Sequence, residues 1–261
     1  MIMKFPIFVF LFFPAILSCA PTAPDTADTI AANAERAIER AGHCADAAAL
    51  AGAVKSLDAA LAAAPDQPAL LYTRGYACYV DSGLHRGPRN QTAGEQYLRD
   101  AAGFLERVKG APWETEAAAL RGAILGALIG MQKDPAQAGA TLGPESSRLL
   151  AQAAAAAPTS PRVLIFRGQS LLFTPPEYGG DPVEGAALLQ KAVDGFAAAP
   201  PTDGPHWGHT EALTWLGFAR QKTGDLAAAR AAWQQALAIE PNYAWVKFVL
   251  LPSLGQPPST R

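Results

Sequence analysis

The chain has 261 residues, half of them hydrophobic, and a formal net charge of −2 at pH 7. It is long enough and apolar enough to form a core in one or two domains. It lacks the dense cluster of Lys and Arg that neutralises phosphates, so we expect no nucleic-acid partner.

Residues 1–18 have the pattern of a secretory signal peptide. One cation, Lys4, precedes an uncharged apolar run from Phe5 to Leu17, and small residues follow. The run has 13 residues, whereas a helix that crosses a bilayer needs about 20. We therefore expect this segment to direct export and to be removed, not to serve as a membrane anchor.

The end of this segment determines how the chain is processed. The sequence Ile16-Leu17-Ser18-Cys19 resembles the bacterial lipobox, which implies that Cys19 becomes the lipidated first residue of the mature chain. Because Ala20 follows, the resemblance also implies the outer membrane. The mature chain would carry 20 basic and 23 acidic side chains, a formal charge of −3. Ordinary cleavage after Ala20 is the alternative, although Pro21 disfavours it.

The composition divides the mature chain into three parts. Residues 19–28 are rich in Ala, Pro and Thr and are predicted to be a flexible tether. We expect the folded domain over residues 29–252 and a disordered C-terminal tail over residues 253–261.

Two cysteines, Cys44 and Cys78, remain in the predicted folded domain. In an oxidising compartment they are candidates for a disulfide. The alternative is that both are small buried hydrophobic residues. We expect no thiol catalyst, because no partner is placed to orient the neighbouring His43 and no CxxC motif is present.

An internal repeat organises the predicted domain. Four apolar segments share a central glycine, and each is followed by an alanine-rich segment. A glycine inside a helix costs about 1 kcal/mol relative to alanine. We therefore predict that these glycines lie where two paired helices approach closely. The shared glycines are Gly75, Gly122, Gly168 and Gly217.

Together with an earlier pair, these segments predict five helix-turn-helix units. The last unit, residues 210–243, resembles the tetratricopeptide repeat (TPR) family. It matches the small and large positions of that family at Leu216, Gly217, Ala219, Ala229, Trp233, Ala236 and Pro241. The earlier units are longer, and we expect enlarged turns at 81–93, 133–145 and 174–182. The resemblance implies an all-α fold, an α-solenoid of about five units in a right-handed superhelix.

In the TPR family the first helix of each pair lines a concave surface. The resemblance therefore implies a groove for a protein or peptide partner, and the tyrosines there are frequent interface anchors. The alternative is that two of the three tyrosines of the second unit, Tyr72, Tyr76 and Tyr79, pack against neighbouring helices. The predicted partner-binding residues are Tyr72, Tyr76, Tyr79, Arg162, Gln169, Glu211, Phe218 and Lys222.

The turn at 174–182 contains four further candidates, Tyr178, Gly179, Gly180 and Asp181. One interpretation is turn chemistry followed by a helix cap at Asp181. The other is contact with a ligand.

No motif indicates an enzyme. The sequence contains no HExxH, GxSxG, P-loop or Rossmann fingerprint, so we expect neither catalysis nor a cofactor. His206, His209 and Glu211 are close enough in sequence for a zinc site. Polar residues are common at a helix start, however, and we predict no metal.

These observations lead to a main hypothesis and an alternative. The first is a non-enzymatic scaffold of the periplasm, tethered to the outer membrane by lipid, that binds an envelope protein or peptide through its concave face. The second is a small-molecule receptor or an accessory lipoprotein subunit of an envelope transporter.

Overall fold

The computed structural model describes residues 26–85, 90–198 and 204–255, and all of its regular elements are helical. The predicted signal peptide, Cys19 and most of the predicted tail lie outside these residues. No helix in the described ranges is both long and apolar enough to cross a bilayer. The elements are α1 (Ala27–His43), α2 (Ala47–Ala63), α3 (Pro68–Leu84), α4 (Gln91–Glu106), α5 (Trp113–Met131), α6 (Pro135–Ala156), α7 (Pro161–Phe173), η1 (Pro176–Tyr178), α8 (Pro182–Ala198), α9 (His209–Lys222), α10 (Leu226–Ile239), η2 (Val246–Leu250) and α11 (Leu251–Ser253).

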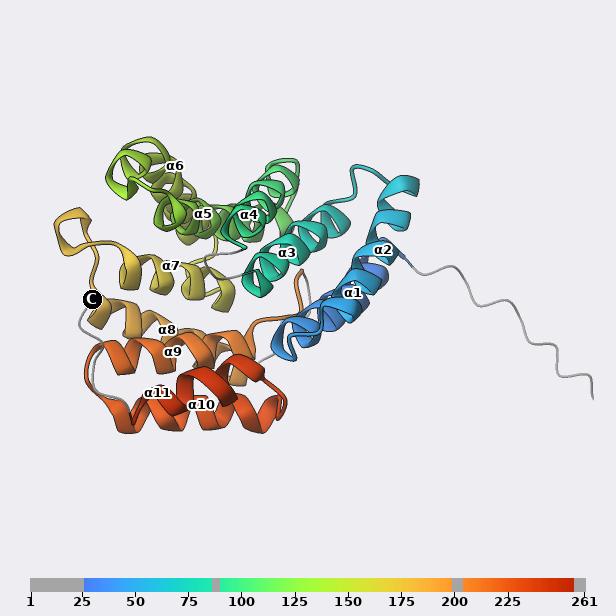
Figure 1. The fold of residues 1–261 in the computed structure, drawn as a ribbon. Helices are drawn as coiled ribbons and strands as arrows, with labels where there is room; N and C mark the ends of the chain where they lie inside the picture. The colour runs from blue at the N-terminus through green and yellow to red at the C-terminus, as the bar shows by residue number, and fades with distance from the viewer. Residues whose placement is uncertain (1–25, 86–89, 199–203, 256–261) are drawn as a thin grey trace, which may run out of the picture.

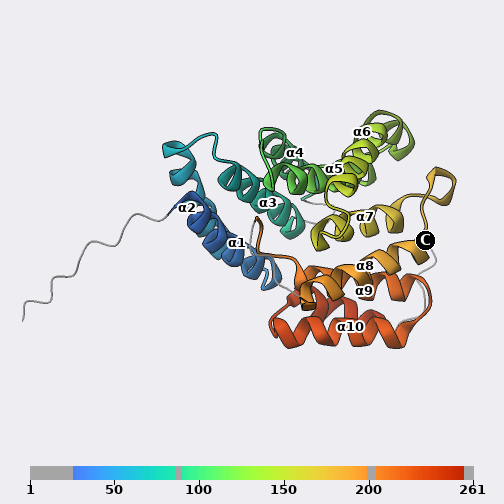
Figure 2. The same ribbon diagram turned by 180° about the vertical axis from the view of Figure 1, so that it is seen from behind.

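The helices form five consecutive pairs, from α1/α2 to α9/α10, as the sequence predicts (Figure 1). The first helix of each pair also packs against the first helix of the next pair. These first helices, α1, α3, α5, α7 and α9, form what we call the inner wall. The chain follows a curve that brings the segment before α9 back beside α1 (Figure 2).

The repeated glycines lie at the seams between paired helices. A Cβ atom added to Gly75 would lie 2.8 Å from Cγ of Leu105 in α4, and one added to Gly168 would lie 2.7 Å from Cγ of Leu189 in α8. At Gly217 it would overlap the indole of Trp233 in α10. These distances are shorter than normal van der Waals contact. The prediction that these glycines lie where two paired helices approach closely is therefore confirmed.

The arginine that precedes two of these glycines joins successive units. Arg74 of α3 donates to Asp58 of α2 over 2.7 Å, and Arg121 of α5 donates to Glu106 of α4 over 2.9 Å. Both carboxylates are largely exposed. Pairs of this kind stabilise by about 0–1 kcal/mol, so they mainly orient one unit relative to the next.

One predicted turn is wrong. Residues 133–145 are mostly helical, because α6 begins at Pro135 and runs for 22 residues through Pro144. Asp134 caps the helix by accepting a hydrogen bond from the backbone N–H of Gln137 over 3.0 Å. An aspartate followed by proline is a strong helix start, and this local signal outweighs the interior proline.

The other predicted limits need small corrections. α3 continues to Leu84 and α4 begins at Gln91, so the turn expected at 81–93 is shorter. α1 begins at Ala27 because Thr26 caps it, which shortens the predicted tether by two residues. At the other end α11 reaches Ser253, one residue past the predicted limit.

Both cysteines are free thiols in the structure, so the disulfide interpretation is not supported. Cys78 is buried in α3, and Arg74 donates to its sulfur over 2.8 Å. Burial raises the pKa of the Cys78 thiol to about 11, although Arg74 opposes this change. A thiol with so high a pKa is a poor nucleophile at neutral pH.

Candidate functional site

A non-helical stretch lies against the inner wall. Residues Gly204-Pro205-His206-Trp207-Gly208 lead into α9, and we call them the inner segment. Only 2% of the Trp207 surface is exposed. Its ring stacks on Tyr76 of α3 with a centroid separation of 4.1 Å and an interplanar angle of 13°. Phe166 of α7 lies 6.0 Å away on a tilted plane.

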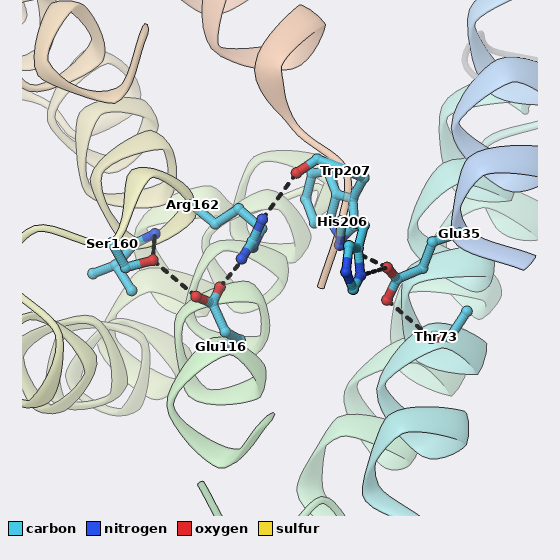
Figure 3. Close-up of polar contacts among 8 residues, drawn as sticks. Glu35, Thr73, Glu116, Ser160, Arg162, His206 and Trp207 are labelled. Carbon is cyan, nitrogen blue, oxygen red and sulfur yellow. Dashed lines mark hydrogen bonds and ion pairs between the residues drawn. The ribbon is translucent and has the colours of Figure 1, made fainter. Parts of the chain in front are cut away.

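Side chains from two separate helices of the inner wall, α1 and α7, hold the backbone of the inner segment (Figure 3). Glu35 of α1 accepts a hydrogen bond from the N–H of His206 over 2.7 Å. Glu39, one turn later, accepts from the N–H of Gly208 over 3.0 Å. Arg162 of α7 donates to the carbonyl oxygen of Trp207 over 3.1 Å. The inner segment therefore connects the first unit to the fourth.

Two of these charged side chains belong to buried polar networks. Glu35 is fully buried and also accepts from the hydroxyl of Thr73 over 3.1 Å. Arg162 forms a buried ion pair with Glu116 of α5 over 3.1 Å, and Ser160 donates to the same carboxylate over 2.8 Å. A buried charge is tolerated only where partners replace its hydration. The networks consequently fix α1, α3, α5 and α7 around the inner segment.

The negative charge of Glu39 has fewer partners to offset its burial than the charges of Glu35 and Arg162 have. Burial raises the pKa of its carboxyl, and the charges of Glu211 and Glu35 raise it further. His43 and the N–H of Gly208 act in the opposite direction. The net direction is upward, so the charged form of Glu39 is disfavoured in the folded protein.

Replacing Glu39 by glutamine is expected to stabilise the protein at pH 7.5, with a Tm about 2–4 °C higher, equivalent to about 1 kcal/mol. The amide oxygen of glutamine still accepts from Gly208 but carries no charge to desolvate. The folded-state pKa of Glu39 is raised, so its contribution to stability is present below the unfolded pKa and is lost as pH rises through the folded pKa.

The difference in Tm between the Glu39→Gln variant and the unmodified protein should therefore shrink toward zero at pH 4. Thermal unfolding followed by circular dichroism measures this difference. A stabilisation that is equal at pH 4 and pH 7.5 would contradict this account of Glu39.

The structure buries four predicted partner-binding residues. Tyr72 and Tyr76 pack beneath the inner segment, Arg162 is bonded to it, and Gln169 is buried on α7. In this structure these four side chains are therefore not exposed to a partner, because the groove already holds part of the chain. The alternative interpretation, that two of the three tyrosines pack internally, is the arrangement observed. Tyr79 is half-buried.

The remaining predicted residues lie along α9. Glu211 is partly buried, accepts from the indole N–H of Trp215 over 3.0 Å, and lies 3.8 Å from Nε2 of His43. Phe218 and Lys222 lie two and three turns further along the helix and both contact Phe173 of α7.

Four side chains, one at the end of α7 and three along α9, form what we call the aromatic ledge: Phe173, Trp215, Phe218 and Lys222. Phe173 is 56% exposed, and its ring centroid lies 5.7 Å from that of Trp215 and 5.6 Å from that of Phe218. The ammonium of Lys222 donates to the carbonyl of Leu172 and lies 5.7 Å from the Phe173 ring centroid. The ledge thus places one exposed ring, Phe173, against a buried and a partly buried ring and beside a cation.

Phe218 and Lys222 were predicted from the sequence, whereas Phe173 and Trp215 were not. For Phe173 the missed signal is a large aromatic residue at the very end of an apolar helical run, directly before a turn, where burial is incomplete. Trp215 is a buried residue in the middle of α9 and carries no such signal.

The four loop candidates act as a turn and a helix cap. Gly179 has a φ of 91°, and a Cβ atom at Gly180 would overlap the carbonyl of Thr174, so the turn requires both glycines. Asp181 accepts from the N–H groups of Val183 and Glu184 over 2.8 and 3.0 Å. Tyr178 is exposed beside this turn. Turn chemistry therefore accounts for the loop.

The three residues considered for zinc have separate partners. His206 lies 3.8 Å from a carboxylate oxygen of Glu35, His209 stacks on Phe196 with its pKa lowered by burial, and Glu211 lies near His43. Among the residues described, no three His, Cys, Asp or Glu side chains are grouped so that they could hold a metal ion.

No family model and no curated protein matches the chain. Two solved structures are similar at 16% identity and a TM-score of 0.35: "MamA 41-end from Desulfovibrio magneticus RS-1" and the "MamA RS-1 ArsTM double mutant". The matches cover 85% and 84% of this chain and 99% and 97% of the other chains. A likeness at this TM-score supports no conclusion about function.

The architecture itself defines the class. Five helix pairs with close glycine seams and a shared inner wall make this an all-α helical repeat protein.

Proposed function

We propose that this protein is a non-enzymatic binding scaffold that recognises a protein or peptide partner through the open part of its concave face. The proposal includes a periplasmic location, with Cys19 lipidated and the chain tethered to the outer membrane. The aromatic ledge is the single observation that supports partner binding most strongly. Its core residue, Phe173, exposes more than half of its surface although three other side chains of the ledge surround it.

An exposed phenylalanine is unfavourable in water, and a rigid aromatic surface beside a cation is typical of interface anchors. Phe173 rests on two further rings, so it is held in one position before a partner arrives. Binding at such a surface loses little side-chain entropy. The ledge therefore suits an apolar or aromatic side chain of the partner, with the Lys222 ammonium at its edge.

Truncating the ledge is expected to weaken the interaction. Phe173→Ala and Phe218→Ala should each cost about 1–2 kcal/mol of binding free energy, or roughly tenfold in affinity. The measurement is crosslinking and affinity purification from the native envelope, followed by titration of the purified partner.

Val183→Ala provides a matched control, because Val183 is also an exposed apolar residue but lies at the start of α8, outside the ledge. We expect it to bind as the unmodified protein does. If both ledge variants retain helical circular dichroism and full affinity, the ledge is not the binding surface.

The tether is tested separately at Cys19. The variant Cys19→Ser is expected to lose incorporation of labelled palmitate and to leave the membrane fraction. A Cys19→Ser protein that stays labelled and membrane-bound would refute lipidation at this residue.

A further inference from the structure

We infer that the inner segment is an internal ligand of the concave groove, and that the partner segment which displaces it carries an aromatic side chain flanked by free backbone N–H groups. This inference rests on the proposed function, because it specifies the chemistry of the polypeptide that the concave face accepts.

The inner segment is held in the manner of a bound peptide. It is non-helical, and it inserts one large side chain, Trp207, against the rings of Tyr76 and Phe166. Its other contacts are made by side chains of the wall to its backbone, through Glu35, Glu39 and Arg162. Backbone hydrogen bonds plus one anchored side chain are the usual basis of peptide recognition. Any segment with the same anchor and the same two N–H donors can make these contacts.

The shape of the groove adds a second requirement. Gly208 has a φ of 118°, and a Cβ atom there would lie 3.0 Å from Phe196 and 3.4 Å from Arg162. A side chain at that position would therefore strain the backbone and crowd the wall. The preferred partner segment consequently has a glycine directly after its aromatic residue.

The inner segment does not provide a hydrogen-bond partner for every polar group in the groove. Among the residues that the structure describes, the buried amide nitrogen of Gln169 has no hydrogen-bond partner, and the buried hydroxyl of Tyr72 and indole N–H of Trp207 meet no partner other than each other. A buried polar group without a partner costs about 1–3 kcal/mol. These costs reduce the net stabilisation that the inner segment provides. A partner segment that supplies a hydrogen-bond acceptor beside Tyr72 would gain a contact that the inner segment lacks.

Release of the inner segment also leaves the repeat intact. Residues 204–207 belong to no helix, Gly208 is the N-cap residue of α9, and the five helix pairs pack against each other through their own close contacts. Opening the groove therefore breaks the contacts to Glu35, Glu39, Arg162 and Tyr76 without removing an intrahelical hydrogen bond of those helices.

The test uses a labelled synthetic peptide with the sequence GPHWGHT, which reproduces residues 204–210. The full chain carrying Trp207→Ala should bind this peptide at least tenfold more tightly than the unmodified chain, as measured by fluorescence anisotropy. A peptide with alanine in place of tryptophan should not bind. Adding Tyr76→Ala to the Trp207→Ala chain should abolish binding, because it removes the ring on which the tryptophan stacks.

A second variant, Gly208→Ala, loosens the inner segment and keeps every side chain of the groove. It should also gain peptide binding, and it decides the question if the Trp207→Ala chain does not fold. Helical variants that bind the peptide no better than the unmodified chain would overturn the inference. So would loss of helicity in both variants, since the inner segment would then be a fixed part of the core. The assay involves no cellular partner and no ledge residue, so its failure is distinct from failure of the ledge variants in the affinity purification.

Discussion

Replacing Arg162 by alanine is expected to lower the free energy of unfolding by about 3–5 kcal/mol. The substitution leaves the buried carboxylate of Glu116 with Ser160 as its remaining hydrogen-bond donor, and it removes the donor to the carbonyl of Trp207. An uncompensated buried charge accounts for most of the loss. Urea unfolding followed by circular dichroism measures it, and the Tm should fall by about 10 °C.

Two comparisons show whether the loss of stability comes from burial of the remaining charge or from loss of an ion pair alone. Arg148→Ala breaks an ion pair with Glu145 over 2.8 Å at the surface, and should leave the midpoint of urea unfolding almost unchanged. The double variant Arg162→Met with Glu116→Leu removes both buried charges and should lose much less stability than Arg162→Ala alone. If Arg162→Ala costs no more than Arg148→Ala, the buried network does not hold the inner segment in place.

The repeat could be predicted from the sequence because its cause is local. Gly75, Gly122, Gly168 and Gly217 recur at nearly equal spacing, and each is needed only because the partner helix of the same unit approaches closely. A pattern set within one helix pair is visible in about 40 residues of sequence.

The inner segment could not be predicted in this way. Its backbone is bonded to Glu35 and Glu39, which lie 171 and 169 residues earlier in the chain. The residues around Trp207 suggest only a helix start. No local pattern shows that the curve of the repeat brings these residues back beside α1. Burial of Tyr72 and Tyr76 follows from that closure, which explains why the sequence of α3 alone did not reveal that both side chains are inaccessible.

The candidate site was predicted in part for a similar reason. Phe218 and Lys222 belong to the last unit, where the resemblance to a known repeat is closest, so their places in the helix α9 could be read from the sequence. Phe173 reaches the same surface from α7 because two successive units stack. Contacts between units depend on the curvature of the whole array, which the sequence of a single unit does not reveal.

Replacing Gly217 by alanine is expected to destabilise the protein by about 1–3 kcal/mol, although alanine is the better helix former. The new methyl group would overlap the fully buried indole of Trp233, whose N–H donates to the carbonyl of Thr214 over 3.0 Å. Gly103→Ala is the matched control, because Gly103 lies in the interior of α4 with open space around it, and it should stabilise by up to about 1 kcal/mol. Urea unfolding should therefore give opposite signs for the same chemical change. Equal signs would mean that helix propensity, and not the seam with α10, determines which residue position 217 accepts.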